Sequence, residues 1–122
     1  MAAILVVEDD PDIAALVAHK LRTAGHDVDM VGDGTAGLAA IRAQRPALVV
    51  LDWMIPGLDG IEVCEAVRAD ADLAATRILM LTAKAQESDL ERAFRAGADE
   101  YVQKPFSTRE LVLRAQSILA RT

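Results

Sequence analysis

Polar residues that can do chemistry stand directly after apolar segments of this sequence. They are Glu8, Asp9 and Asp10 after Ala3–Val7, Asp52 after Leu48–Leu51, Thr82 after Ile78–Leu81, and Lys104 soon after Glu100–Val102. Carboxylates that crowd together repel one another, and protonation, a cation or a lysine must relieve the repulsion. A hard divalent cation fits best, because Mg2+ takes oxygen ligands and typically combines one or two carboxylates with waters and a substrate phosphate. No His or Cys lies in these segments, which argues against zinc.

The elements that position these residues follow from the hydrophobic pattern, because short aliphatic runs alternate with longer stretches of helical period. The expected strands are Ala3–Val7, Val28–Val31, Leu48–Leu51, Ile78–Leu81 and Glu100–Val102. The expected helices are Pro11–Ala24, Gly34–Ala43, Ile61–Ala69, Ser88–Ala96 and Thr108–Leu119. Three of the strands are apolar on both faces, as in a covered parallel sheet, whereas the second and fifth are mixed and suit sheet edges. The pattern predicts a (βα)5 domain.

In an open, doubly wound sheet, ligands bind beyond the carboxyl ends of the strands where the strand order reverses. With the order 2-1-3-4-5 the first and third strands are neighbours, so Asp9 and Asp52 approach each other while Thr82 and Lys104 flank them. The competing interpretation is that acidic residues near helix starts are only caps. We expect that role for Asp10, which precedes a first-turn proline.

Composition narrows the function classes further. The 122 residues suit one domain over residues 1–122, and the net charge of -6 with a pI near 4.8 disfavours direct binding to nucleic acid. The single Cys64 excludes an internal disulfide, which favours a cytoplasmic protein. The apolar runs are too short for a membrane span or a signal peptide.

Five ordered motifs cover almost the whole chain. They are Ile4-Leu5-Val6-Val7-Glu8-Asp9-Asp10, Leu51-Asp52-Trp53-Met54-Ile55-Pro56-Gly57-Leu58-Asp59-Gly60, Leu81-Thr82-Ala83-Lys84, Gly97-Ala98-Asp99-Glu100-Tyr101 and Lys104-Pro105-Phe106. Together they resemble the receiver domain of bacterial two-component response regulators. The resemblance implies a flavodoxin-like, doubly wound three-layer fold with the parallel sheet order 2-1-3-4-5.

The resemblance also assigns roles to residues of the acidic cluster. It implies that Asp52 accepts a phosphoryl group from a phosphohistidine on a sensor kinase, with Mg2+ as the cofactor. Asp9 matches the direct metal ligand and Glu8 the ligand that acts mainly through water. Asp52 itself also matches a metal ligand, and Met54 matches the position that ligates the metal by its backbone carbonyl.

Further roles concern the transferred group and the response to it. Lys104 and the Thr82 hydroxyl would each contact a phosphoryl oxygen, with a backbone N–H near Ala83 beside the hydroxyl. Lys104-Pro105 resembles the cis peptide of the family. Thr82 and Tyr101 are expected to form the switch: Thr82 moves inward, and the Tyr101 ring rotates from solvent towards the sheet.

Partners follow from the same resemblance. A sensor histidine kinase or a phosphotransfer protein would supply the phosphoryl group, and residues 88–114 would control an output domain or a partner protein. A homodimer on phosphorylation is compatible with this, because Glu100 and Arg114 resemble one of the charged pairs in winged-helix regulators. That class forms its other charged pairs with residues at three further positions. In this chain those positions hold Leu90, Arg95 and Gln116.

Three alternatives remain open at the level of the sequence. Asp10-Pro11-Asp12 resembles the Asp-x-Asp pair of a small haloacid-dehalogenase-type phosphatase, although Pro11 would start a helix and carry Asp12 away. A flavodoxin-like FMN carrier shares the strand order, but this chain has acidic residues where a phosphate loop would lie. The third alternative is a degenerate receiver that binds partners without phosphorylation. The main interpretation is a signalling phosphoacceptor, not an enzyme acting on a separate substrate.

Overall fold

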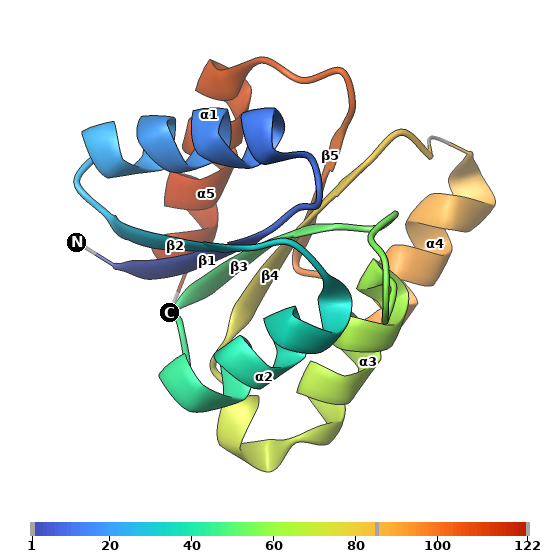
Figure 1. Cartoon of the computed structure of the whole chain (residues 1–122). Helices are drawn as coiled ribbons and strands as arrows, with labels where there is room; N and C mark the ends of the chain where they lie inside the picture. The colour runs from blue at the N-terminus through green and yellow to red at the C-terminus, as the bar shows by residue number, and fades with distance from the viewer. Residues whose placement is uncertain (1, 85, 122) are drawn as a thin grey trace.

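A parallel five-stranded sheet forms the middle layer of the computed structural model, which describes residues 2–84 and 86–121 (Figure 1). The strands are β1 (Ala3–Val7), β2 (Asp27–Val31), β3 (Leu48–Asp52), β4 (Arg77–Thr82) and β5 (Glu100–Gln103). Their order is β2-β1-β3-β4-β5, and every neighbouring pair is parallel. The predicted flavodoxin-like sheet is therefore confirmed, with the two mixed strands β2 and β5 at its edges.

Helices cover both faces of this sheet. They are α1 (Pro11–Thr23), α2 (Gly34–Gln44), α3 (Gly60–Ala69), α4 (Glu87–Ala96) and α5 (Thr108–Leu119), with one 3-10 turn at Ala71–Leu73. α1 and α5 pack on one face, and α2, α3 and α4 on the other (Figure 1). Two apolar clusters result, one on each side of the sheet, because β1, β3 and β4 direct alternate side chains to opposite faces. Within the described ranges, no helix combines the length and the apolar content that crossing a bilayer requires.

Element boundaries agree with the sequence expectations to within one residue at each end. The differences matter at two strands, since β3 includes Asp52 and β4 includes Thr82. The hydrogen bonds of the sheet hold these two residues, because Asp52 pairs with Leu81 in the register and the Trp53 N–H donates to the Leu81 carbonyl at 2.9 Å. The candidate site is thus built on strand ends as well as on loops.

Side chains cap most helix N-termini. Asp10 accepts hydrogen bonds from the N–H groups of Asp12 and Ile13, with Pro11 in the first turn of α1, as the sequence predicts. Asp33, Asp59 and Ser107 cap α2, α3 and α5 in the same way. Such caps satisfy N–H groups that have no partner within the helix. These caps also fix where α1, α2, α3 and α5 begin beyond the carboxyl edge of the sheet.

Candidate functional site

Three carboxylates meet at the carboxyl ends of β1 and β3. Glu8, Asp9 and Asp52 each offer one oxygen, and these oxygens lie within 4.8 Å of one another. The fold brings them together because β1 and β3 are neighbours although α1, β2 and α2 separate them in the chain. Glu8 and Asp52 are 3% and 4% exposed, whereas Asp9 is exposed to solvent. The predicted proximity of Asp9 and Asp52 is confirmed.

Lys104 bridges two members of this cluster. Its Nζ donates to Glu8 Oε1 at 2.9 Å and to Asp52 Oδ2 at 3.0 Å. The backbone N–H of Lys104 donates to the Thr82 carbonyl at 2.8 Å, and the Lys104–Pro105 peptide bond is cis, as in the family that the sequence resembles. The sequence placed Lys104 beside the cluster but did not predict its bond to Glu8. That bond depends on the reach of a long side chain, which spacing does not reveal.

The electrostatics of the cluster follow from burial and from these contacts. Burial, and then the hydrogen bond with Asp52, raise the pKa of Glu8 despite the opposing effect of Lys104. Burial alone would lower the pKa of Lys104, but its hydrogen bonds to Glu8 and Asp52 outweigh that effect and raise it. Lys104 therefore stays charged at neutral pH. One ammonium group leaves three neighbouring carboxylates only partly compensated.

The donor set of the cluster fits a hard cation. Carboxylate oxygens dominate it, and Cys64, the chain's one cysteine, is buried in α3. The Met54 N–H donates to Asp52 Oδ1 at 3.2 Å, which places the Met54 backbone next to the same carboxylate. Met54 as a residue is 62% exposed.

Thr82 ends β4 next to Asp52 and is fully buried. Its Oγ1 accepts a hydrogen bond from the Lys84 N–H at 3.0 Å. The hydroxyl proton is free to be donated to another acceptor, because accepting that bond uses only a lone pair. Thr82 therefore lies where the sequence places it, one strand away from Asp52.

Tyr101 lies farther from the cluster, on the edge strand β5. It pairs with Met80 in the register, two residues before Thr82 on β4. Its ring is half-buried against the α2–α3–α4 side of the core, and its hydroxyl is buried without a hydrogen-bond partner among the described residues. Burial, and then the charge of Asp89, raise the pKa of Tyr101. The sequence expectation starts this ring in solvent, whereas the structure holds it inward, because packing the aromatic ring offsets the cost of the unbonded hydroxyl.

Two features beside the site were missed at the level of sequence. A Cβ on Gly60 would lie 2.7 Å from Trp53 Cα and 2.8 Å from the Asp52 carbonyl oxygen, so only glycine allows α3 to start against the end of β3. The buried Trp53 ring has Lys84 Nζ at 5.3 Å and Arg92 Cζ at 5.8 Å from its centroid. The glycine at the first position of α3 was the sequence signal for the close approach of this helix to β3. No spacing rule links Trp53 to Lys84 and Arg92.

The phosphatase alternative finds no support in this geometry. Both Asp10 hydrogen bonds cap α1, and Asp12 is an exposed residue of that helix, outside the carboxylate cluster. Pro11 begins helix α1, and the helix carries Asp12 away from the site, as the sequence predicts.

The doubly wound fold, with an acidic cluster at its switch point and a lysine across it, defines a flavodoxin-like α/β protein with a charged site at the carboxyl edge of its sheet. Comparison with known families identifies which one. The chain belongs to the family of response regulator receiver domains, which matches residues 4–116. It is thus the receiver domain of a response regulator, a signalling module with a phosphoacceptor role.

Individual relatives agree with this assignment. The chain is 47% identical over 118 residues to the DNA-binding response regulator MtrA of Mycolicibacterium smegmatis, covering 97% of this chain and 50% of that protein. It is 42% identical over 122 residues to the transcriptional regulator RpaA of Synechocystis, covering 100% and 51%. The chain therefore spans about half the length of the curated relatives that it matches. The structure of the chemotaxis response regulator CheY4 of Vibrio cholerae has a TM-score of 0.92 at 31% identity, covering 97% of this chain and 98% of that one.

Proposed function

We propose that Asp52 accepts a phosphoryl group from a phosphohistidine of a sensor histidine kinase or a phosphotransfer protein, in a reaction that depends on Mg2+. The observation that carries this proposal is the Lys104 bridge. Its ammonium group contacts Asp52 Oδ2 and Glu8 Oε1, so a fixed positive charge stands beside a buried carboxylate at the carboxyl edge of the sheet. That is the arrangement that a phosphoryl group with negative oxygens requires.

The reaction is a displacement at phosphorus. A carboxylate oxygen of Asp52 forms the new P–O bond, the P–N bond to the donor imidazole breaks, and the electron pair of that bond returns to the imidazole nitrogen. Lys104 is placed to neutralise one oxygen of the transferred group. The buried Thr82 hydroxyl can donate to another oxygen, and the backbone N–H of the exposed Ala83 is the candidate donor beside it.

Mg2+ is the cofactor that the carboxylate set supports. Glu8, Asp9 and Asp52 would hold it together with the Met54 backbone carbonyl, Asp9 directly and Glu8 mainly through water. When bound, the cation supplies positive charge that offsets the charge of the carboxylates and of the transferred group. The chain contributes the nucleophile, the lysine and the hydroxyl.

The signalling consequences belong to the surface formed by α4, β5 and the start of α5, residues 88–114. We propose that this surface controls an output domain or a partner protein, because relatives twice as long are described as DNA-binding regulators. Residues 1–122 would then be one receiver domain acting in the cytoplasm. A homodimer of phosphorylated chains is compatible with this surface, but Glu100 is already engaged by Arg114 at 3.4 Å and Arg121 at 3.1 Å within its own chain.

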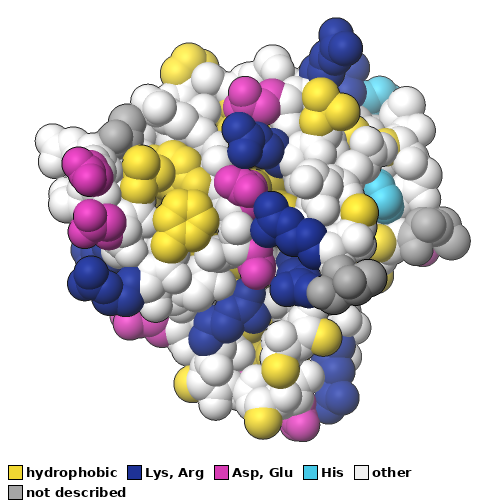
Figure 2. Space-filling model, turned by 180° about the vertical axis from the view of Figure 1, so that it is seen from behind, with side chains coloured by type: hydrophobic (Ala, Val, Ile, Leu, Met, Phe, Trp, Pro, Cys, Tyr) yellow, Lys and Arg dark blue, Asp and Glu magenta, His cyan; other side chains and the backbone are white. Residues whose placement is uncertain are grey.

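We assign no direct nucleic-acid binding to this domain. Its net charge is -6, and Figure 2 shows acidic side chains beside the basic ones on the visible face. Phosphate backbones are bound by clustered positive charge. Any DNA recognition would therefore reside in an additional domain.

Intact-mass spectrometry after incubation with acetyl phosphate and Mg2+ tests the central proposal. The wild-type chain should gain the mass of one phosphoryl group, and Asp52→Asn should gain none because it lacks the nucleophile. Asp10→Asn is the matched control, since it removes a neighbouring carboxylate that caps α1 and should leave the modification intact. An adduct that persists in Asp52→Asn, or an unchanged wild-type mass, would contradict the proposal.

A further inference from the structure

A pocket lies between α1 and α5, the two helices that share one face of the sheet (Figure 1). Its volume is about 300 Å3, against about 200 Å3 for the pocket beside Glu8 and Asp9. A volume of about 300 Å3 is at the lower end of the range for small-molecule sites in proteins. None of the described residues that line the α1–α5 pocket belongs to the carboxylate cluster. The pocket is therefore a second candidate site, separate from that of Asp52.

Apolar side chains of α5 form part of the wall of this pocket. Val112 is half-buried against the apolar cluster on this face of the sheet, and Leu113 is 57% exposed. Lys20 of α1 and Arg109 of α5 also line the pocket. Side chains of this kind lay an aliphatic stem on apolar surface and keep the charged end in water. An apolar ligand group placed here would remove the surface of Val112 and Leu113 from water, which favours binding.

The charged residues of the pocket wall, Lys20 and Arg109, are both basic. No Asp or Glu is among the described residues that line the pocket, although the whole chain has a net charge of -6. The other polar side chains of the wall are threonines, Thr23 and Thr108 among them, whose hydroxyls can donate to an anion or accept from a protonated group. Two cations without a neighbouring carboxylate make this a locally positive site in an acidic protein. Such a site attracts anions.

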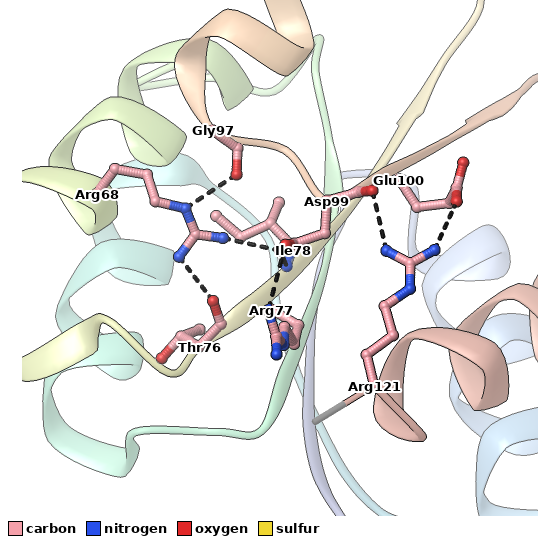
Figure 3. A network of polar contacts seen from close by, with 8 residues as sticks. All are labelled: Arg68, Thr76, Arg77, Ile78, Gly97, Asp99, Glu100 and Arg121. Carbon is pink, nitrogen blue, oxygen red and sulfur yellow. Dashed lines mark hydrogen bonds and ion pairs between the residues drawn. The ribbon is translucent and has the colours of Figure 1, made fainter.

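These two cations are not neutralised within the fold, whereas several others are. Figure 3 shows one that is: Arg68 Nη2 donates to Asp99 Oδ2 at 2.8 Å. Within the part of the chain that the structure describes, the side chains of Lys20 and Arg109 form no hydrogen bond and no ion pair. A ligand that binds them therefore breaks no existing contact among these residues.

We propose that the α1–α5 pocket binds a small amphipathic anion, with its apolar tail on Val112 and Leu113 and its carboxylate or phosphate head group beside Lys20 and Arg109. A simple inorganic anion would leave the apolar wall in water, and a neutral apolar molecule would leave both cations without a partner. The guanidinium group of Arg109 can hold either head group by two parallel hydrogen bonds. The proposal does not depend on phosphorylation of Asp52, because the two sites share no described residue.

A titration of the wild-type chain with octanoate, followed by amide chemical shifts, tests this proposal. Saturable shift changes should be confined to the lining residues, with a Kd on the order of 1 mM, as expected for a ligand of about ten non-hydrogen atoms. Octanol has the tail without the charge, and acetate has the charge without the tail. Each should bind at least about tenfold more weakly than octanoate. Octanol that binds as tightly as octanoate would overturn the proposal.

Octyl phosphate distinguishes the two head groups. Binding of octanoate or of octyl phosphate at the lining residues supports the proposal, and the tighter of the two identifies the head group. Binding of neither would overturn it. Shift changes at the same amides on raising the protein concentration alone would assign the pocket to a second copy of this chain, which would also overturn it.

A pair of variants tests the head-group contact. Arg109→Gln should weaken the binding of octanoate about tenfold, the factor that loss of a single charged contact implies. Arg95→Gln is the matched control, because it removes the same charge from an exposed arginine of α4 outside this pocket. Surface substitutions of this kind leave the fold stable. Equal Kd values for the two variants would overturn the assignment of Arg109 and with it the proposed site.

Discussion

Asp9 is the solvent-exposed member of the carboxylate cluster, since Glu8 and Asp52 are buried and bonded to Lys104. A cation arriving from water meets Asp9 first. Binding to Asp9 does not require the protein to break the ion pairs that Lys104 makes with Glu8 and Asp52. Glu8, in contrast, is already engaged by the lysine. At the scale of single residues, this difference gives Asp9 the direct role in holding Mg2+ and Glu8 a supporting one.

We therefore expect Asp9→Ala to weaken Mg2+ binding at least about tenfold, the factor that loss of a single charged contact implies. Trp53, the chain's one tryptophan, adjoins Asp52 and offers a fluorescence signal for the titration. Asp12→Ala is the control, because it removes the same charge from an exposed position outside the cluster. Identical titration curves for the two variants would show that Asp9 does not hold the cation.

Cys64 shows what burial does to a group that the site does not use. Burial raises the pKa of its thiol from the ordinary 9.0 to about 11. Between these values the unfolded chain loses the thiol proton and the native chain keeps it, so the free energy of unfolding falls as pH rises; below pH 9 both states are protonated and the effect is absent. We expect this fall to be steeper than in Cys64→Ala by roughly 1 kcal/mol per pH unit, in urea unfolding between pH 9 and 11. Parallel profiles for the two proteins would contradict the effect.

The junction between β3 and α3 shows how one element positions another. The Gly60 N–H donates to the Trp53 carbonyl at 2.8 Å, and its Cα approaches the backbone of Asp52 and Trp53 too closely for a side chain. The start of α3 thus presses on the strand end that carries the candidate phosphoacceptor. Asp59 and Glu62 fix that start further by a reciprocal capping box.

Gly60→Ala should consequently destabilise the chain by about 1–3 kcal/mol, the usual cost of overpacking a site whose neighbours are backbone atoms. Gly32→Ala is the matched control, since nothing lies within 4 Å of a Cβ at that position. We expect the control to change stability by no more than about 0.5 kcal/mol. Equal midpoints for the two variants in urea unfolding would refute the argument from close approach.

At this scale, the elements that depend on neighbouring residues were predictable from the sequence, and contacts that long side chains make between distant residues were not. Apolar runs and helical periods predicted every strand and every α-helix, because both signals depend on neighbouring residues. The meeting of Asp9 and Asp52 was also predictable, because parallel strands end at one edge of the sheet. The hydrogen bonds of Lys104 with Glu8 and of Arg68 with Asp99 were not, since each joins residues far apart in the chain through a long side chain. Arg68 in sequence is indistinguishable from an ordinary arginine near a helix end.

At the scale of the whole molecule, the question is how a change at Asp52 reaches the α4–β5–α5 surface. Thr82 and Tyr101 lie on adjacent strands, and the Tyr101 hydroxyl is buried without a partner among the described residues. Turning the ring outward would let water bond that hydroxyl but would expose the ring. The free energy gained by hydrating the hydroxyl thus opposes the free energy lost by exposing the ring. Two such opposing contributions of similar size allow both ring positions to be populated.

A phosphoryl group can shift this equilibrium only by its differential contacts, of order 1–3 kcal/mol, so we expect the minor position of Tyr101 to be populated at about 0.1–10% before activation. Relaxation-dispersion NMR of the ring and of the Tyr101 amide should detect exchange with the outward position, and beryllofluoride should deplete that outward position and so reduce the dispersion. Thr82→Val keeps the side-chain volume and removes the hydroxyl, so beryllofluoride should still shift residues 52–54 while most of the response at Tyr101 is lost. If Tyr101 and residues 88–114 do not move in the wild-type chain while residues 52–54 do, Tyr101 is a static edge-strand residue, and the signal leaves the site by another route.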